Sequence, residues 1–160
     1  MSRKKEKIQL VPYTPEYQEV FKQLNEAWIR QYFKMEDKDY ESLDHPEETI
    51  LDKGGQIIVA LWKGRPVGVC ALIKSDNSKY PYELAKMGVA PEARGLGIGY
   101  RLGLAIIKNA KELGARNLFL ESNTILEPAI SLYRKLGFKE IQGYTSPYER
   151  SNIQMLLELD

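Results

Sequence analysis

The sequence has very few of the residues that build metal sites and disulfides. It contains one cysteine, Cys70, and one histidine, His45, in 160 residues. A single cysteine cannot form an internal disulfide, and zinc sites use more cysteine and histidine ligands than these two residues supply. We therefore expect no bound metal and a reducing, cytoplasmic environment.

Strong charge of one sign and long apolar runs are also missing. Twenty-three basic and twenty-two acidic side chains leave a net charge of +1, so the chain has no global basic field of the kind that binds nucleic acid. No apolar run approaches the roughly 20 residues that a membrane-spanning helix needs. We expect neither nucleic acid nor a membrane among the partners.

The length favours one domain. A chain of 160 residues can bury enough surface to stabilise a core without disulfides, and no repeat or low-complexity linker divides it. The basic start is not followed by an apolar segment. We therefore expect residues 1–7 to be a flexible basic arm rather than a secretory signal, and residues 8–160 to be a single domain.

Hydrophobic periodicity and turn residues predict alternating strands and helices. Helices are expected over residues 16–33, 46–51, 96–113 and 126–136. Strands are expected over residues 8–11, 56–62, 66–73, 82–89, 117–121, 138–141 and 153–159. The charged stretch 36–44 is assigned to neither. The predicted fold class is α+β, with one mixed sheet.

The most informative motif lies between a predicted strand and a predicted helix, and it reads Arg94-Gly95-Leu96-Gly97-Ile98-Gly99. Three glycines weaken local structure unless the backbone must approach another group closely. A helix N-terminus offers free N–H donors and roughly half a positive charge, so a diphosphate can bind there, beside the fixed charge of Arg94. The alternative is a turn that only allows close packing of helix and strand.

Two other phosphate-binding motifs fit this stretch less well. A Rossmann fingerprint requires Gly-x-Gly-x-x-Gly, but position 100 is Tyr, and Glu121 meets only loosely the acidic position about 20 residues downstream. A P-loop requires Gly-Lys-Ser/Thr, which does not follow. A Rossmann-type protein that binds NAD rather than CoA is kept as a third hypothesis.

Two motifs in order resemble those of the GNAT superfamily of N-acetyltransferases. Val89-Ala90-Pro91-Glu92-Ala93-Arg94-Gly95-Leu96-Gly97-Ile98-Gly99 resembles motif A, whose signature is Arg/Gln-x-x-Gly-x-Gly/Ala. Pro128-Ala129-Ile130-Ser131-Leu132-Tyr133-Arg134-Lys135-Leu136-Gly137-Phe138 resembles motif B, with a predicted strand between the two. The resemblance implies a mixed, mostly antiparallel sheet of six to seven strands, about four helices, and a V-shaped splay between strands 4 and 5.

The resemblance also implies acetyl-CoA as co-substrate, bound in the splay between strands 82–89 and 117–121. The pantetheine arm would pair with main-chain groups of the first strand, one of which would polarise the thioester carbonyl. Gly88 suits such an approach, although a strand glycine also marks bulges. The implied cofactor-binding residues are Met87, Gly88, Val89, Arg94, Gly95, Leu96, Gly97, Ile98, Gly99, Tyr100 and Asn123.

Asn123 departs from the superfamily's commoner pattern. There an asparagine stands three residues before the motif B alanine, and this chain has Leu126 at that position. Asn123 follows the second strand of the splay, where it could bond the pantetheine or a catalytic water. An asparagine that only forms a turn is the equal alternative.

For catalysis, the resemblance implies Tyr133 as general acid and Glu83 as candidate general base. Tyr133 occupies the motif B tyrosine that commonly protonates the CoA thiolate, and a phenol with a pKa of about 10 is protonated at neutral pH. The alternative is an aromatic residue that fills the core. Glu83 stands eleven residues before Arg94, as does the strand glutamate of the histone-acetylating branch. Its alternative is an exposed carboxylate paired with Lys86 or Lys79, with ordered water as the base.

Three further features are assigned no chemistry. Cys70 lies in the middle of a predicted strand and is expected to be a buried small hydrophobe rather than a nucleophile. His45 is expected to be a loop or cap residue. The acidic residues of segment 36–44 are expected to form a solvated face, with attraction of an amine as the alternative.

The sequence thus predicts an acetyl-CoA-dependent N-acetyltransferase that moves acetyl to a primary amine by direct attack in a ternary complex. A catalytically inactive CoA-binding regulatory module is the alternative. Variable loops choose the acceptor in this fold, so the sequence does not distinguish a small-molecule from a protein amine. Edge strands near the C-terminus allow a homodimer.

Overall fold

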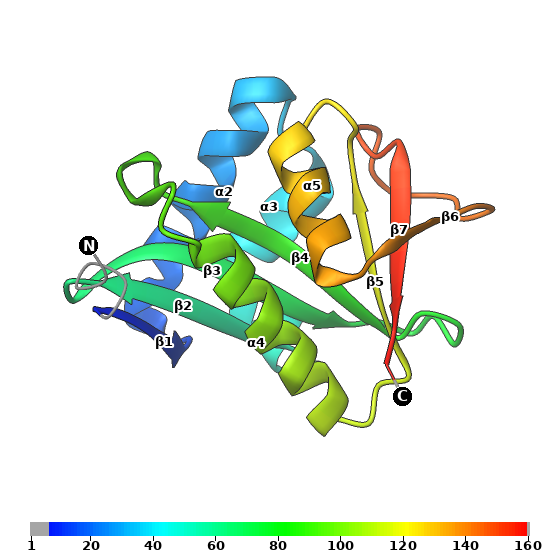
Figure 1. The fold of residues 1–160 in the computed structure, drawn as a ribbon, viewed down its shortest axis with the longest axis horizontal. Helices are drawn as coiled ribbons and strands as arrows, with labels where there is room; N and C mark the ends of the chain where they lie inside the picture. The colour runs from blue at the N-terminus through cyan, green and yellow to red at the C-terminus, as the bar shows by residue number, and fades with distance from the viewer. Residues whose placement is uncertain (1–6, 160) are drawn as a thin grey trace.

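The computed structural model describes residues 7–159, where seven strands form one sheet of order β1-β2-β3-β4-β5-β7-β6 (Figure 1). Neighbouring strands are antiparallel except for β4 and β5, which are parallel. This confirms the predicted mixed, mostly antiparallel sheet. Apart from Lys7, the predicted basic arm lies outside the described residues. The strands are β1 (Ile8–Pro12), β2 (Gln56–Trp62), β3 (Arg65–Lys74), β4 (Tyr82–Val89), β5 (Asn117–Ser122), β6 (Lys139–Ile141) and β7 (Ile153–Glu158).

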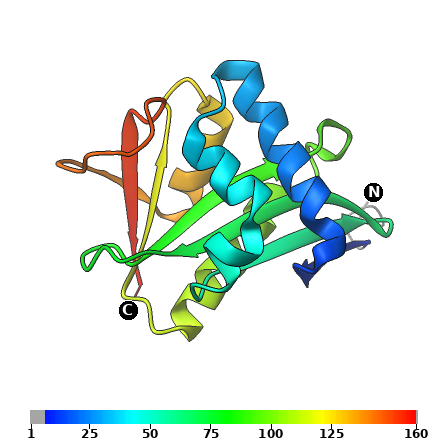
Figure 2. The same cartoon turned by 180° about the vertical axis from the view of Figure 1, so that it is seen from behind.

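Four α-helices in the described range cover the two faces of this sheet. One face carries α2 (Gln18–Tyr32) and α3 (Asp37–Asp44), and the other carries α4 (Ile98–Glu112) and α5 (Glu127–Leu136), as the two opposite views show (Figures 1 and 2). Three short helical turns complete the chain: η1 (Pro15–Tyr17), η2 (Glu47–Leu51) and η3 (Pro91–Ala93). None of the helices within residues 7–159 combines the length and the apolar character that crossing a membrane requires.

Helix α3 was not predicted, because its segment is dominated by charged residues. Its start is fixed by reciprocal capping: the Glu36 side chain accepts from the main chain of Asp39, and the Asp39 side chain accepts from the main chain of Glu36. Such a capping box stabilises the first turn of a helix. The predicted helix 46–51 is instead the single turn η2, which has π-helical hydrogen bonding.

The core lies in two layers, one on each face of the sheet. Strands β2 and β3 are almost continuously apolar because helices cover both of their faces. Alternate residues of a strand point to opposite faces, so Val59 and Val69 pack with Phe21 of α2. On the other side, Cys70 and Leu72 belong to a second buried cluster that includes residues of α4.

Strands β4 and β5 diverge almost as soon as they meet. They pair only at Glu83 and Phe119, and further along β4 its edge is not paired with β5. The main-chain groups of this edge therefore remain available to another extended group. The splay implied by the superfamily resemblance is present between the fourth and fifth strands.

Candidate active site

A cavity of about 500 Å³ occupies the splay. Its walls come from β4, the end of β5, α2, α5 and the loop before β7. Among its lining residues are eight of the predicted site residues: Glu83, Met87, Gly88, Val89, Arg94, Gly99, Asn123 and Tyr133. The other five lie in the adjoining turn or the first turn of α4, outside the cavity wall: Gly95, Leu96, Gly97, Ile98 and Tyr100.

Two glycines of the turn are required by backbone conformation. Gly95 and Gly97 have φ angles of 84° and 76°, in the left-handed region, and a Cβ added to either would meet no atom within 4 Å. Gly97 is the N-cap of α4, and its carbonyl accepts from the main-chain N–H of Arg101 at 3.1 Å. The space in front of the helix N-terminus is therefore open to an anion.

Other residues of the motif are explained by packing rather than by a ligand. A Cβ on Gly99 would lie 3.1 Å from Leu132 Cδ2, and Ile98 is 2% exposed in the core. Gly88 also has a packing reason, because an added Cβ would lie 3.0 Å from the carbonyl oxygen of Leu24 in α2. The structure therefore leaves anion binding open at Gly95 and Gly97, whereas Gly88 and Gly99 have a reason in close packing.

Glu83 and Tyr133 reach the cavity from opposite faces of the sheet. Glu83 pairs with Ile73 on β3, and residues paired across antiparallel strands point to the same face. Ile73 packs in the cluster on the α2 and α3 face. Tyr133 packs against the cluster on the α4 and α5 face, with its ring 6.2 Å from that of Phe138. The two candidate proton-transfer groups thus approach one cavity from its two sides.

The carboxyl group of Glu83 holds its proton unusually tightly. Burial raises its pKa to about 8, and the nearby charge of Glu121 adds to the rise, while Lys86 and Lys38 oppose it. Within the described residues, Glu121 Oε1 is itself buried without a hydrogen-bond partner. A glutamate with this pKa can accept a proton from an amine near neutral pH, where an ordinary glutamate is too weak a base.

The phenol of Tyr133 is held in its neutral form. Burial raises its pKa above the usual 10.0, and Cys70 contributes in the same direction. A neutral phenol is a hydrogen-bond and proton donor. The Cys70 thiol is fully buried, as expected, and burial raises its pKa as well. This disfavours the thiolate, the form in which cysteine attacks.

The side chain of Asn123 holds a turn within the cavity wall. Its Nδ2 donates to the carbonyl oxygen of Arg150 at 2.8 Å, and its Oδ1 accepts from the main-chain N–H of Ile125 at 2.9 Å. The second bond is an Asx turn. These contacts favour the turn-forming alternative for Asn123.

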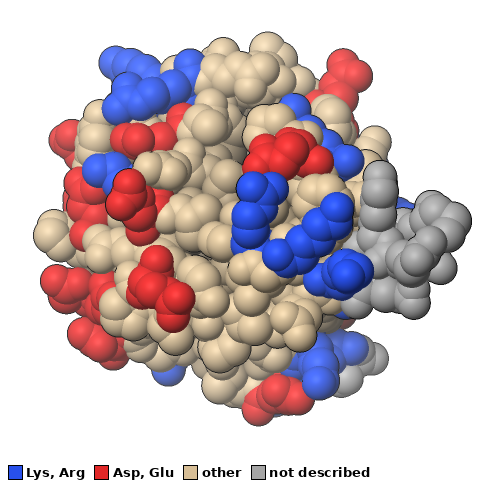
Figure 3. Space-filling model, turned by 90° about the vertical axis from the view of Figure 1, so that its left-hand side faces the viewer, with Lys and Arg blue, Asp and Glu red and all other residues tan. Residues whose placement is uncertain are grey.

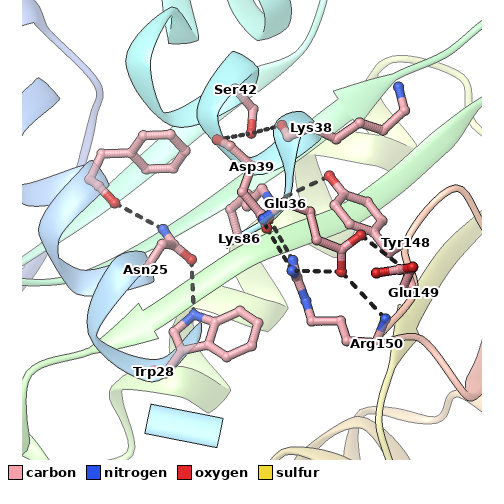
Figure 4. A network of polar contacts seen from close by, with 11 residues as sticks. Asn25, Trp28, Glu36, Lys38, Asp39, Ser42, Lys86, Tyr148, Glu149 and Arg150 are labelled. Atoms are coloured by element: carbon pink, nitrogen blue, oxygen red, sulfur yellow. Dashed lines mark hydrogen bonds and ion pairs between the residues drawn. The ribbon is translucent and has the colours of Figure 1, made fainter. Parts of the chain in front are cut away.

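The expected solvated acidic face is wrong for Asp39. This side chain is fully buried and accepts from Arg150 Nη1, Arg150 Nη2 and Lys86 Nζ, each at 2.6 Å (Figure 4). Burial alone would raise its pKa, but the hydrogen bonds from Arg150 and the charge of Lys86 lower it to about 2. Lys86, which the sequence offers as a partner for Glu83, is ion-paired with Asp39 instead.

Three cavity residues carry no sequence signal of a functional site: Trp28, Lys86 and Arg150. The guanidinium of Arg150 lies 5.6 Å from the ring centre of Trp28 and 4.7 Å from that of Tyr148, and it also contacts Glu36. Asp39 is separated from Lys86 by 47 positions and from Arg150 by 111. Only the tertiary fold brings these charges together.

His45 lies outside the cavity wall. His45 is exposed and is the C-cap of α3, as expected for a cap residue. Its Nδ1 lies 3.7 Å from Oε2 of Glu48. Within residues 7–159, no group of three or more His, Cys, Asp or Glu side chains is placed to hold a metal ion.

The near-neutral total charge conceals a separation of charge between segments. Residues 16–52, which include α2 and α3, contain eleven acidic and four basic residues, whereas residues 94–116, which include the glycine turn and α4, contain one acidic and five basic residues. On the face shown in Figure 3, most acidic side chains lie towards the left-hand margin, whereas basic side chains lie both at the upper left and towards the right. The glycine turn thus belongs to a segment whose charged residues are mostly basic, and the segment that covers the opposite face of the sheet has mostly acidic ones.

Comparison with known proteins shows the family. The model of the acetyltransferase (GNAT) family matches residues 18–138. The N-acetyltransferase YjgM of Escherichia coli is 31% identical over 122 residues, which cover 74% of this chain and 72% of that protein. A mycothiol acetyltransferase of Pseudarthrobacter chlorophenolicus is 37% identical over 95 residues, which cover 58% of this chain but only 29% of that longer protein.

The solved structures agree with the family match. A GNAT-family acetyltransferase from Staphylococcus aureus superimposes with a TM-score of 0.85 at 25% identity, covering 96% of this chain and 99% of that one. The family uses acetyl-CoA as its acyl donor, which fits the glycine turn at the start of α4 and the open edge of β4. The chain therefore belongs to the GNAT family of acetyltransferases, and it is an acyltransferase that uses acetyl-CoA.

Proposed function

We propose that this protein transfers the acetyl group of acetyl-CoA directly to a primary amine while both substrates are bound. The observation that carries the proposal is the single cavity through the β4–β5 splay, which Glu83 and Tyr133 line from opposite sides. Such a cavity lets the acceptor reach the thioester from one side while the CoA thiol leaves on the other.

In the proposed reaction, Glu83 takes a proton from the acceptor ammonium, and the free amine attacks the thioester carbonyl carbon. Main-chain groups of Met87, Gly88 and Val89 on the unpaired edge of β4 bind the pantetheine arm and stabilise the negative oxygen of the tetrahedral intermediate. The carbon–sulfur bond then breaks, and Tyr133 gives its proton to the CoA thiolate. The acceptor nitrogen releases its second proton to solvent as it becomes an amide, and the phenolate of Tyr133 regains a proton from solvent. The raised pKa of Glu83 and the neutral phenol of Tyr133 suit these two roles.

The cofactor's diphosphate would bind at the N-terminus of α4. Gly95 and Gly97 are exposed and have no side chain that would block the main-chain N–H groups of the helix N-terminus, and Arg94 supplies a positive charge that is fixed at any physiological pH. Asn123 is proposed only to hold the cavity wall, since both of its polar groups are occupied by main-chain partners.

The acceptor is proposed to be a cationic amine that enters from the α2 and α3 face. Most charged residues of the segment that covers that face are acidic, and Glu83 and Glu121 both line the cavity. Opposite charge raises the local concentration of a substrate near such a surface. The apolar rings of Trp28 and Phe33 also line this end, so the amine would carry an apolar portion.

The test is an acetyl-transfer assay over a panel of amines, with Tyr133→Phe and Glu83→Gln beside the wild type. Each substitution is expected to lower kcat at least about tenfold, which corresponds to about 1.4 kcal/mol of barrier. The control is Tyr82→Phe, because Tyr82 lies on the same strand as Glu83 but outside the cavity wall.

Three results would contradict the proposal. If acetyl-CoA raised the Tm of the wild type but no amine were acetylated, the protein would be a CoA-binding module. If Tyr133→Phe and Glu83→Gln both kept full turnover, transfer would not use these residues. A Tm raised by NAD and not by acetyl-CoA would point to a dinucleotide-binding protein.

A further inference from the structure

Lys86 lies at an irregular point of β4. On either side of it, Gly88 pairs with Val69 and Ala85 pairs with Ala71, so β4 uses one more residue than β3 between these pairs. This arrangement is a β-bulge, which bends the strand and interrupts its ladder. Lys86 adopts the left-handed conformation, with φ of 55°; Lys63, in the β2–β3 turn, is the other non-glycine residue in residues 7–159 with a positive φ.

A non-glycine residue keeps this conformation only where its surroundings hold it there. The Lys86 side chain is 5% exposed, and its Nζ lies 2.6 Å from Oδ1 of Asp39, whose side chain is 0% exposed. The Tyr148 hydroxyl lies 3.4 Å from the same nitrogen, and the Tyr148 ring centre 5.0 Å from it. Figure 4 shows Lys86 and Arg150 converging on Asp39.

Asp39 is itself firmly anchored. It accepts two hydrogen bonds from Arg150 and one from the main-chain N–H of Glu36 in the capping box of α3. The lysine head group is therefore fixed relative to α3 and to the loop before β7. A lysine side chain has four rotatable bonds, so fixing its end would not by itself restrict the backbone. Here the side chain is buried along its length, and this burial transmits the restriction to the backbone of Lys86.

The bulge lies immediately before the main-chain groups that would bind the thioester. Met87, Gly88 and Val89 follow Lys86 directly, and β4 has no partner on its β5 side beyond Glu83. A one-residue change in strand register moves every later residue to the opposite face. Loss of the bulge would therefore turn these groups away from the cleft.

We propose that the buried Asp39–Lys86 ion pair holds the left-handed backbone of the β4 bulge and thereby positions the main-chain groups that bind the thioester of acetyl-CoA. Lys86 is a positioning residue, and its amine neither gives nor takes a proton in the reaction. The inference rests on the acetyl transfer proposed above, and it adds two residues to that site that do not contact the reacting atoms.

The central test compares two substitutions of Lys86. Lys86→Met removes the ion pair but leaves a side chain that disfavours the left-handed region, so kcat is expected to fall at least about tenfold. Lys86→Gly also removes the ion pair, but glycine adopts this conformation freely, so kcat is expected to stay within about threefold of the wild type. Lys63→Met is the matched control, because Lys63 has the same backbone conformation on an exposed turn.

Asp39 is tested by a double-mutant cycle. Asp39→Asn alone is expected to lower kcat about fivefold or more, whereas adding it to Lys86→Gly should lower kcat by less than about twofold. If Asp39→Asn lowered kcat by the same factor in the wild type and in Lys86→Gly, Asp39 would act without Lys86 and the inference would be overturned. The inference would also be overturned if Lys86→Met and Lys86→Gly lowered kcat equally, or if neither lowered it.

A spectroscopic readout separates this inference from the proposed function. The infrared carbonyl stretch of isotopically labelled acetyl-CoA should shift to lower frequency when it binds, because a main-chain N–H polarises the carbonyl. The shift is expected to shrink in Lys86→Met and to persist in Lys86→Gly. This comparison needs no acceptor, so it remains decisive even if no amine is acetylated. An equal shift in wild type and Lys86→Met would refute the positioning role.

Discussion

At the scale of single residues, burial sets the protonation states of the two proposed proton-transfer groups. Desolvation favours the neutral form of a carboxylic acid and of a phenol, so it raises the pKa values of both Glu83 and Tyr133. For Tyr133 the effect keeps a proton available. For Glu83 it produces a base whose strength approaches that of its amine substrate more closely than an exposed glutamate could.

The first prediction concerns the pH dependence of transfer. Because the base must be deprotonated and its pKa is about 8, kcat/KM should rise about tenfold per pH unit below that value and level off above it. Glu83→Gln should remove this dependence. A wild-type profile that is flat from about pH 6 to about pH 9 would contradict the assignment of Glu83.

The same pKa makes a separate prediction about stability. The folded pKa of Glu83 lies above its ordinary value of 4.5, so its favourable contribution is complete below that ordinary value and is lost as the pH rises through about 8. Relative to the wild type, Glu83→Gln should therefore gain thermal stability as the pH rises from about 4.5 to about 8, and the difference should stay constant above that. The measurement is Tm against pH for both proteins, and a Tm difference that is constant over that rise in pH as well would argue against a raised pKa.

Cys70 provides a test against a covalent acetyl-enzyme. The thiol is fully buried and its pKa is raised, so Cys70→Ala should keep kcat within about threefold while lowering stability by about 1 kcal/mol. Steady-state kinetics and urea unfolding measure the two quantities. Loss of transfer with an intact fold would indicate that the thiol takes part in the reaction.

At the scale of elements, the start of α4 is proposed to bind an anion, whereas its end is not. Gly97 at the N-cap and Gly114 just beyond the C-terminus both have positive φ, and a Cβ added to either would enter open space. The helix dipole makes only the first of these positions attractive to phosphate. The two glycines are therefore alike in conformation, and only Gly97 is proposed to bind the cofactor.

We predict that Gly97→Ala and Gly114→Ala lower stability by similar amounts, about 1–2 kcal/mol for a left-handed alanine. Only Gly97→Ala should also raise KM for acetyl-CoA, by roughly tenfold, because the strained N-terminus moves its N–H groups away from the diphosphate. Urea unfolding and initial rates at saturating amine provide the two measurements. Equal KM values in the two variants would show that the turn does not bind the cofactor.

At the scale of the whole molecule, one buried charge cluster joins parts of the chain that are distant in sequence. Asp39 of α3, Lys86 of β4 and Arg150 of the loop before β7 meet beside the cavity. These three elements form the wall through which the acceptor is proposed to enter. Their relative positions therefore depend on ion pairs as well as on apolar packing.

The strength of this cluster can be compared with that of an exposed pair of equal length. Arg150–Asp39 and Lys22–Asp44 both span 2.6 Å, but the exposed fractions of the side chains are 12% and 0% in the first pair and 37% and 36% in the second. Arg150→Met should cost about 3–5 kcal/mol because it removes one partner of a buried charge. Lys22→Met should cost less than about 1 kcal/mol. Urea unfolding measures both free energies. If Arg150→Met and Lys22→Met lowered the free energy of unfolding by similar amounts, the burial of Asp39 would contribute nothing to the strength of its ion pair.

The sequence by itself determined those features that depend on neighbouring residues. Helix α4, the hairpin of β2 and β3, and the glycine turn follow from apolar spacing and from backbone conformations that only glycine adopts easily. Motif order led to the splay between β4 and β5 and to the placement of Glu83 and Tyr133 beside it. Helix α3 was missed because its charged composition conceals the few residues that face the core.

Only the tertiary structure decided the electrostatics of the site and the shape of β4. The pKa of Glu83 depends on burial and on Glu121, which belongs to another strand. Lys86, at the bulge of β4, is hydrogen-bonded to Asp39, which stands 47 positions earlier. Charges interact through space and desolvation depends on the whole surrounding surface, so no local pattern in the sequence contains this information.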